Sequence, residues 1–234
     1  MQATTAPRTR RLGVRDAAAQ ATRESILRAA TKVFTKYGFD GGSVDKISTA
    51  AKTHDRMIYY YFGSKEGLFV AVLEGVYHRM DVAEAAIELD YSRPAEAFAK
   101  IVRFKMAYYR DNPDFVTLLN NENLHKGRHI AKSTRAREYS SRAVGYVEKI
   151  LSSGAREGLF RQDLSARDVY LLIVSASYFY HSNRYTLTAF LDEPLEAPER
   201  FEHWVAFVTE SVMRGICAEG RFHPAGKSPP GHLA

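Results

Sequence analysis

Residues 43–65 have the sequence SVDKISTAAKTHDRMIYYYFGSK, which predicts two short helices joined by a turn. Ser43 is a favoured N-cap residue, and Asp45 follows in the first turn, where a negative charge suits the positive end of the helix. At helical spacing, one side of the first helix is apolar and should be buried. That side consists of Val44, Ile47, Ala50 and Ala51.

The second helix is predicted over residues 56–62, and its two faces differ in chemistry at about 100° per residue. The inward face consists of Ile58, Tyr61 and Phe62. The outward face consists of Arg56 and Tyr60, with Met57 and Tyr59 beside them. A helix-turn-helix presents such a face to the major groove of DNA, where arginine binds guanine or phosphate and tyrosine donates to phosphate. The alternative is an ordinary helical hairpin with a solvated face.

The residues around this motif extend the pattern. Residues 22–69, TRESILRAATKVFTKYGFDGGSVDKISTAAKTHDRMIYYYFGSKEGLF, closely resemble the DNA-binding domain of the tetracycline-repressor (TetR) family of bacterial regulators. The matching features are Ala29–Phe34, the Tyr37-Gly38-Phe39 turn, the apolar positions of the first short helix, and Ile58–Phe62 followed by Ser64-Lys65-Glu66. The resemblance implies an all-α fold, with an N-terminal three-helix helix-turn-helix domain and a larger C-terminal helical domain for ligand binding and dimerisation.

The sequence departs from the family at the turn between the two short helices. Where the family usually has Gly-Val-Ser, this chain has Lys52-Thr53-His54. Lys52 would have to adopt a backbone that glycine adopts easily, and Thr53 could replace the capping serine. The candidate DNA contacts are Ser43, Lys46, His54, Arg56, Met57, Tyr59, Tyr60 and Lys65.

Charge is concentrated in the same part of the chain. The 234 residues carry a net charge of +6, and residues 1–66 hold 12 Lys and Arg against 6 Asp and Glu, so they account for the whole excess. Such an excess favours phosphate contacts that weaken as salt is raised. No apolar run is long enough to span a bilayer and no signal peptide is evident, so we expect a cytoplasmic protein with no membrane partner. The lone Cys217 excludes an intramolecular disulfide.

The sequence predicts four segments. Residues 1–20 form a flexible basic arm that either lies along DNA or only aids solubility, residues 21–81 form the helix-turn-helix domain with the motif at 44–63, residues 82–219 form the effector-binding and dimerisation domain, and residues 220–234 are disordered. In the first helix, apolar spacing predicts a buried stripe that ends just before Gly38. The stripe consists of Ile26, Ala30, Val33, Phe34 and Tyr37.

Start signals predict the later helices. They begin at Pro94, at Pro113 after the cap Asn112, near Thr134, after Ser165 and near Pro198, and residues 120–132 form an irregular polar segment. The expected inner residues of the helix after Ser165 are Val169, Leu172, Ile173, Ala176 and Tyr180. The last helix is apolar on two faces, because Phe207 and Met213 lie away from its main stripe, and it therefore needs two partners. One partner would be a second subunit, and the resemblance implies a homodimer joined through helices near 166–182 and 198–217.

His125 and His129 stand four residues apart, a spacing that puts two imidazoles on one helix face and could bind a metal. Because no carboxylate or thiol is placed to complete the shell, we expect no metal site. The sequence also lacks a nucleophile elbow and a glycine-rich phosphate loop after a strand. We therefore expect no cofactor and no enzymatic activity.

The second domain is rich in aromatic residues with a polar tip, which suit an apolar or aromatic ligand held by a few hydrogen bonds. The alternative is that they only fill a helical core. The candidate pocket residues are Tyr108, Tyr109, Phe115, Leu119, His125, Tyr146, Tyr178 and His181.

The resulting hypothesis is a ligand-responsive repressor that binds a palindromic operator on double-stranded DNA as a homodimer and responds to a small-molecule effector. Its half-sites would lie about 34 to 36 Å apart. Two alternatives remain open: a helical protein that binds or converts a small molecule without an operator, and a nonspecific nucleoid-type DNA binder.

Overall fold

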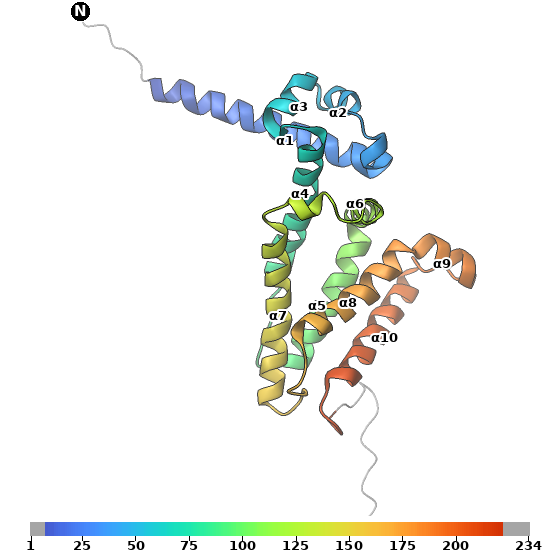
Figure 1. Ribbon diagram of the computed structural model, residues 1–234. Coiled ribbons are helices and arrows are strands. Elements are labelled where there is room, and N and C mark those ends of the chain that lie inside the picture. Colours follow the sequence, from blue (N-terminus) through green and yellow to red (C-terminus); the bar gives the residue numbers. More distant parts are fainter. Residues whose placement is uncertain (1–7, 222–234) are drawn as a thin grey trace, which may run out of the picture. The chain divides into compact units, whose positions relative to one another are not determined.

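The computed structural model describes residues 8–221, with side chains from residue 16 onward. This part of the chain is helical, and its sole β interaction is an isolated bridge between Phe160 and Cys217 (Figure 1). The helices are α1 (Arg8–Gly41), α2 (Val44–Ala51), α3 (Asp55–Phe62), α4 (Lys65–Ala85), α5 (Pro94–Asp111), α6 (Pro113–Leu124), the 3₁₀ helix η1 (Ile130–Lys132), α7 (Ala136–Arg156), α8 (Ala166–Ser182), α9 (Arg184–Leu191) and α10 (Pro198–Ile216). The predicted all-α fold class is confirmed. None of the described helices combines the length and hydropathy that crossing a bilayer requires.

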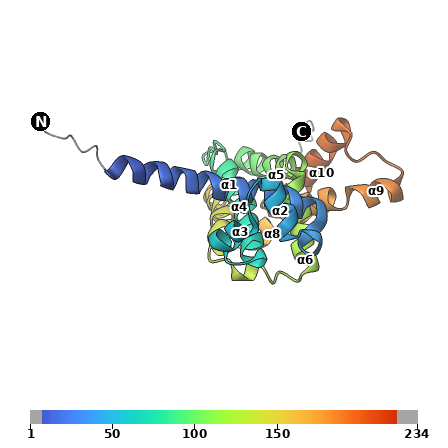
Figure 2. The same cartoon turned by 90° about the horizontal axis from the view of Figure 1, so that it is seen from above.

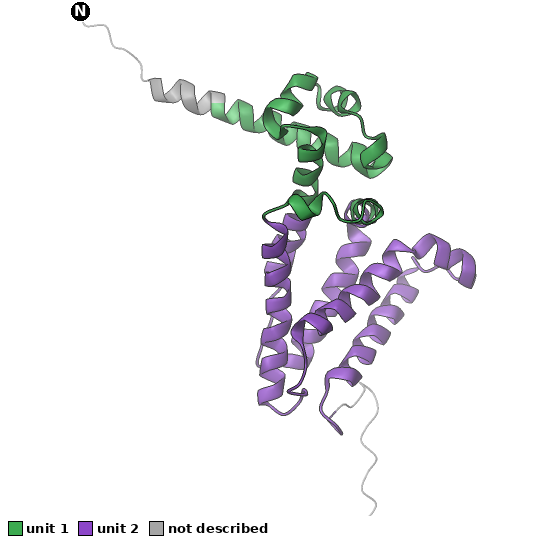
Figure 3. Ribbon diagram, in the orientation of Figure 1, with its two compact units in different colours: residues 1–76, 117–134 green, residues 77–116, 135–234 purple. Residues whose placement is uncertain are grey.

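The chain forms two compact units (Figure 3). Unit 1 contains residues up to Val76 together with residues 117–134, and unit 2 contains residues 77–116 together with the chain from Arg135 onward. The division falls inside α4 and inside α6, so each of these helices contributes to both units. It therefore differs from the sequence-based boundary after residue 81, and a segment from the middle of the chain folds with the N-terminal helices.

In unit 1, α2 packs on α1 and on α3, and the views in Figures 1 and 2 show the three helices together. The core consists of Ile26, Ala30, Phe34, Ile47, Ile58, Leu68 and Phe69. The predicted stripe of α1 is confirmed except at Tyr37, which is 45% exposed. Gly38 interrupts the helix with φ 67° and ψ −178°. The ring centre of the next residue, Phe39, lies 5.2 Å from the ring centre of Phe69.

The predicted N-terminal arm is only partly within the described residues. Because α1 begins at Arg8, residues 16–20 are helical and not an arm. The side chains of Arg8, Arg10, Arg11 and Arg15 lie outside the described residues, as do residues 1–7 and most of the tail predicted at 220–234.

In unit 2, α5 packs on α7, α8 and α10. The buried face of α8 is formed by Val169, Ile173, Ser177, Tyr180 and His181. This register leaves Leu172, predicted to be inside, 51% exposed beside Leu171. On α10, Phe207 is exposed as expected, whereas Met213 is buried in the core because the apolar face of α10 is wide enough to include it.

The short helix α9 is not predicted from the sequence. The Nδ2 group of Asn183 donates to the carbonyl of Phe179 and ends α8, and α9 begins at the next residue. Its large apolar side chains are exposed, with Phe190 at 83% and Leu191 at 58%. A helix with so little burial leaves no periodic apolar pattern to detect.

Candidate DNA-binding surface and effector pocket

Helix α2 is fixed by its first turn and by one buried edge. The hydroxyl oxygen of Ser43 accepts a hydrogen bond from the backbone N–H of Lys46 at 3.2 Å, which confirms the predicted N-cap. Ile47 and Ser48 form the buried edge, and the Ser48 hydroxyl donates a hydrogen bond to the carbonyl of Asp45. Ala50 is exposed, contrary to the prediction, because this edge and not the Ala50 side faces the core.

The turn between α2 and α3 forms with lysine in the position of the family's glycine. Lys52 has φ 53° and ψ 47°, a left-handed conformation that costs a non-glycine residue roughly 1 to 2 kcal/mol. The backbone N–H groups of Lys52 and Thr53 compensate by donating to the last carbonyls of α2. Thr53 does not cap α3 as predicted: the N-cap residue is His54, whose exposed side chain makes no capping hydrogen bond.

Helix α3 separates a buried anchor from an exposed face. Ile58 is fully buried, whereas Tyr59 and Tyr60 are 52% and 77% exposed. Arg56 is exposed and has no hydrogen-bond or ion-pair partner among the described residues, and Met57 is half-buried. The outward face predicted from the sequence therefore presents an uncompensated guanidinium and two tyrosines.

The turn from α3 into α4 is tight. The Ser64 hydroxyl accepts a hydrogen bond from the backbone N–H of Gly67 at 2.9 Å and so caps α4. A Cβ at Gly67 would lie 2.2 Å from the carbonyl oxygen of Phe62, closer than two atoms can approach. Glycine is therefore required here, and the turn fixes where Lys65 begins α4.

Three lysines gather around the rings at the end of α1. The Lys65 ammonium lies 4.6 Å from the centre of the Phe39 ring, and burial lowers the pKa of this amine. The ammonium groups of Lys46 and Lys36 lie 4.5 and 5.0 Å from the ring of Tyr37. Lys36 and Tyr37 are not among the predicted DNA contacts. The exposure of Tyr37 depends on where α1 is interrupted, which the apolar spacing of the sequence does not reveal.

Residues 117–134, predicted to include an irregular polar segment at 120–132, are instead folded tightly into unit 1. Helix α6 continues to Leu124, and the Glu122 carboxylate accepts hydrogen bonds from the backbone N–H groups of His129 at 2.8 Å and Ile130 at 2.9 Å. The same carboxylate lies 2.6 Å from Nδ1 of His129, whose ring is fully buried 4.4 Å from that of Phe39. Glu122 thus closes a loop that caps the core of unit 1.

The two histidines considered as metal ligands serve this packing. The rings of His125 and His129 are 5.2 Å apart in an edge-to-face arrangement. Among residues 16–221, no group of three or more His, Cys, Asp or Glu side chains is arranged to hold a metal ion.

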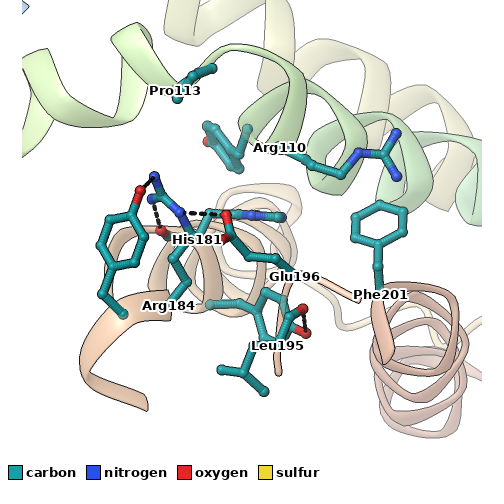
Figure 4. A pocket seen from close by; sticks show the side chains of 10 residues that line it. Arg110, Pro113, His181, Arg184, Leu195, Glu196 and Phe201 are labelled. Carbon is teal, nitrogen blue, oxygen red and sulfur yellow. Dashed lines mark hydrogen bonds and ion pairs between the residues drawn. The ribbon is translucent and has the colours of Figure 1, made fainter. Parts of the chain in front are cut away.

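Unit 2 contains a cavity of about 250 Å³ between α5, α8, α9 and α10 (Figure 4). Tyr109 and His181 are the predicted pocket residues that line it. The residues not predicted are Arg110, Pro113, Tyr180, Arg184, Tyr185, Leu195, Glu196 and Phe201. Five of these eight residues follow the C-terminal end of α8, and four of the five lie on the unpredicted helix α9 or in the loop after it.

The remaining predicted pocket residues lie elsewhere. The ring centres of Phe115 and Tyr178 each lie 5.8 Å from that of Tyr109, which lines the cavity. Phe115 also packs edge-to-face on Tyr108. Tyr108, Phe115 and Tyr178 therefore lie near the cavity without lining it. Tyr146 packs against the main core of unit 2. Leu119 and His125 belong to unit 1.

Comparison with known proteins identifies both parts of the chain. Residues 26–72 match the family model described as bacterial regulatory proteins, tetR family, and residues 94–212 match the model described as tetracyclin repressor-like, C-terminal domain. The chain is 47% identical to the HTH-type transcriptional repressor NicS of Pseudomonas putida over 89% of this chain and 98% of that relative. It is 33% identical to the HTH-type transcriptional regulator RutR of Escherichia coli over 43% of this chain and 47% of that relative.

A solved structure has the same fold. A TetR transcription regulator from Haloarcula marismortui superimposes with a TM-score of 0.64 at 18% identity, over 85% of this chain and 99% of that one. The helix-turn-helix with its exposed arginine and tyrosines, the two family models and the similarity to NicS along nearly the full chain agree with one another. This chain belongs to the TetR family of DNA-binding transcriptional regulators.

Proposed function

We propose that the protein is a repressor that binds a palindromic operator as a homodimer in the cytoplasm and releases it when a small molecule binds. The observation that carries this proposal is the geometry of α3: Ile58 is buried, and Arg56, Tyr59 and Tyr60 are exposed on the remaining surface. The similarity to NicS, a transcriptional repressor by name, supports the direction of regulation.

In this proposal the contacts divide into two kinds. Arg56 and Met57, on the first turn of α3, contact base edges, where a bidentate arginine contributes about 1 to 3 kcal/mol of discrimination. The remaining candidates contact the phosphates and set the position of the protein on DNA. They are Ser43, Lys46, His54, Tyr59, Tyr60 and Lys65.

Exposed apolar side chains on α8 and α10 support the homodimer. The two helices contact each other, and large apolar side chains remain exposed on both. These are Leu171, Leu172 and Phe179 on α8 and Phe207 on α10. Because apolar surface gathered on neighbouring elements is typical of an interface, we propose that a second copy covers it.

The ligand response follows from linkage. A ligand that binds one conformation of the dimer more tightly than another lowers DNA affinity by that difference in binding free energy and by no more. The cavity in unit 2 is the site we propose for this ligand.

DNase I footprinting on the DNA upstream of the protein's own gene tests the proposal. We expect a short palindromic footprint that is lost as salt is raised, since phosphate contacts release counterions. Uniform coverage of operator and unrelated DNA alike would indicate a nonspecific binder, and no protection at all would contradict DNA binding there.

A further inference from the structure

The cavity in unit 2 has the size of a single substituted ring. Its buried wall is formed by Tyr109, Tyr180, His181, Leu195 and Phe201, each at most 5% exposed. A cavity of roughly 150 Å³ is known to hold benzene, so a volume of about 250 Å³ accommodates one aromatic ring together with polar substituents. Four of the five wall residues have an aromatic ring, which favours a flat ligand.

One polar atom in this wall has no partner. The Nε2 atom of His181 is buried without a hydrogen bond, although the ring as a whole is held by a hydrogen bond to the backbone of Met106. Burial, Arg184 and Arg110 together lower the pKa of His181 to about 4, so the imidazole is neutral at pH 7. When the proton of the neutral imidazole lies on Nδ1, Nε2 is an acceptor that lacks a donor.

Two arginines, Arg110 and Arg184, line the cavity together with His181 (Figure 4). Arg184 donates to Glu196, to the carbonyl of His181 and to the Tyr185 hydroxyl, so its five N–H groups include two without an acceptor among the described residues. Arg110 lies 4.1 Å from the centre of the Phe201 ring and pairs with the adjacent Asp111.

The charges that shift the pKa of the imidazole are mainly positive. Both Arg184 and Arg110 act on His181 more strongly than Asp111 does, although the two arginines are each paired with a carboxylate. The potential that disfavours a proton on His181 favours an anion at the same place. The wall is therefore apolar and aromatic with one buried unpaired nitrogen, and the charged residues that line the cavity are Arg110, Arg184 and Glu196.

We propose that this cavity binds a small aromatic carboxylate that also carries a hydroxyl or N–H group, with the carboxylate held by Arg110 and Arg184 and the donor placed on Nε2 of His181. This assignment names the ligand class for the effector site and so rests on the proposed function. A neutral aromatic molecule would leave the positive field without a partner, and an acid without a donor would leave Nε2 unpaired.

Isothermal titration calorimetry on the full-length protein tests the ligand class. The probes are 2-, 3- and 4-hydroxybenzoate, each compared with its methyl ester, with benzoate and with cyclohexanecarboxylate. We expect the best hydroxybenzoate to bind at least roughly tenfold more tightly than each comparison compound, as expected for one lost charged or buried hydrogen bond. Equal affinity of acid and ester, or no binding by any hydroxybenzoate at millimolar concentration, would overturn the proposal.

Two variants locate the binding. Arg110→Gln should weaken the acid roughly tenfold and leave the ester unchanged, whereas the control Arg103→Gln should change neither. Arg103 is a matched control because it lies on the same helix and pairs with Glu202 of α10, but does not line the cavity. His181→Asn keeps a donor for Met106 and removes Nε2, so it should abolish the preference for hydroxybenzoate over benzoate. Equal effects of Arg110→Gln and Arg103→Gln would refute the site.

Operator binding in the same samples separates the two proposals. If the acid binds as expected but leaves operator affinity unchanged, the ligand class stands and the ligand response fails. If the acid and ester bind alike while the operator is bound normally, the ligand class fails and DNA binding stands.

Discussion

Nδ1 of His129 lies 2.6 Å from Oε2 of Glu122, and both side chains are buried in the unit that carries the helix-turn-helix. The pair belongs to a segment far along the chain from that motif. The family's C-terminal model matches residues 94–212 and so includes this pair. The stability of the DNA-binding unit therefore depends on residues from the C-terminal part of the chain.

Glu122→Gln should lower the free energy of unfolding by about 2 kcal/mol, because hydrogen bonds to a charged group contribute about 1.5 to 3 kcal/mol. In the variant, His129 remains buried but loses its carboxylate partner. Urea denaturation followed by circular dichroism measures this. Glu148→Gln on the exposed surface of α7 is the control and should change stability by less than about 0.5 kcal/mol. Similar small changes in both variants would show that the Glu122–His129 contact contributes nothing.

Two glycines of α4 should respond to alanine with opposite sign. A Cβ at Gly67 would lie 2.2 Å from the Phe62 carbonyl, so Gly67→Ala should destabilise the protein and weaken operator binding by displacing α3. Gly75 has nothing within 4 Å of such a Cβ, so Gly75→Ala should raise stability by about 0.5 to 1 kcal/mol through helix propensity. Melting temperatures provide the comparison; a shift in the same direction for both variants would contradict the assigned turn.

Stability should fall in mild acid because of His181. Its pKa in the folded protein, about 4, lies below the usual value of 6.5, so the unfolded state binds the additional proton as pH falls. The contribution is complete above pH 6.5 and is lost towards pH 4, with a slope of at most about 1.4 kcal/mol per pH unit. Burial lowers this pKa most, Arg184 and Arg110 lower it further, and Asp111 opposes them.

The control for this prediction is His181→Asn, which has no group titrating in that range. The difference in free energy of unfolding between wild type and variant should shrink from pH 7 to pH 4. A difference that stays constant over this range would mean that His181 is not held neutral by the fold.

The local chemistry of helix starts allowed much of the fold to be predicted. Ser43 and Ser165 accept the capping hydrogen bonds expected of them, and Pro94 and Pro113 begin their helices. These features depend on neighbours three residues away, which a sequence displays directly. The same holds for the exposed face of α3, because its helical spacing is regular from Arg56 to Phe62.

Features set by distant contacts could not be predicted. In the sequence, Glu122 and His129 look like solvated polar residues. In the structure, the rings of Phe39 and Phe69 pack against His129, and Glu122 accepts hydrogen bonds from the backbone of His129 and Ile130. Likewise, the cavity near His181 is completed by residues 184–201, which fold back through a helix with hardly any buried side chain.

The proposed DNA-binding surface is the outward face of α3. Fluorescence anisotropy with the footprinted operator tests it in Arg56→Ala and in the control Arg156→Ala, which removes an exposed arginine of unit 2. We expect Arg56→Ala to weaken operator binding roughly tenfold or more with an unchanged circular dichroism spectrum, and Arg156→Ala to bind like wild type. Wild-type affinity in a folded Arg56→Ala protein would exclude this face of α3 as the DNA contact.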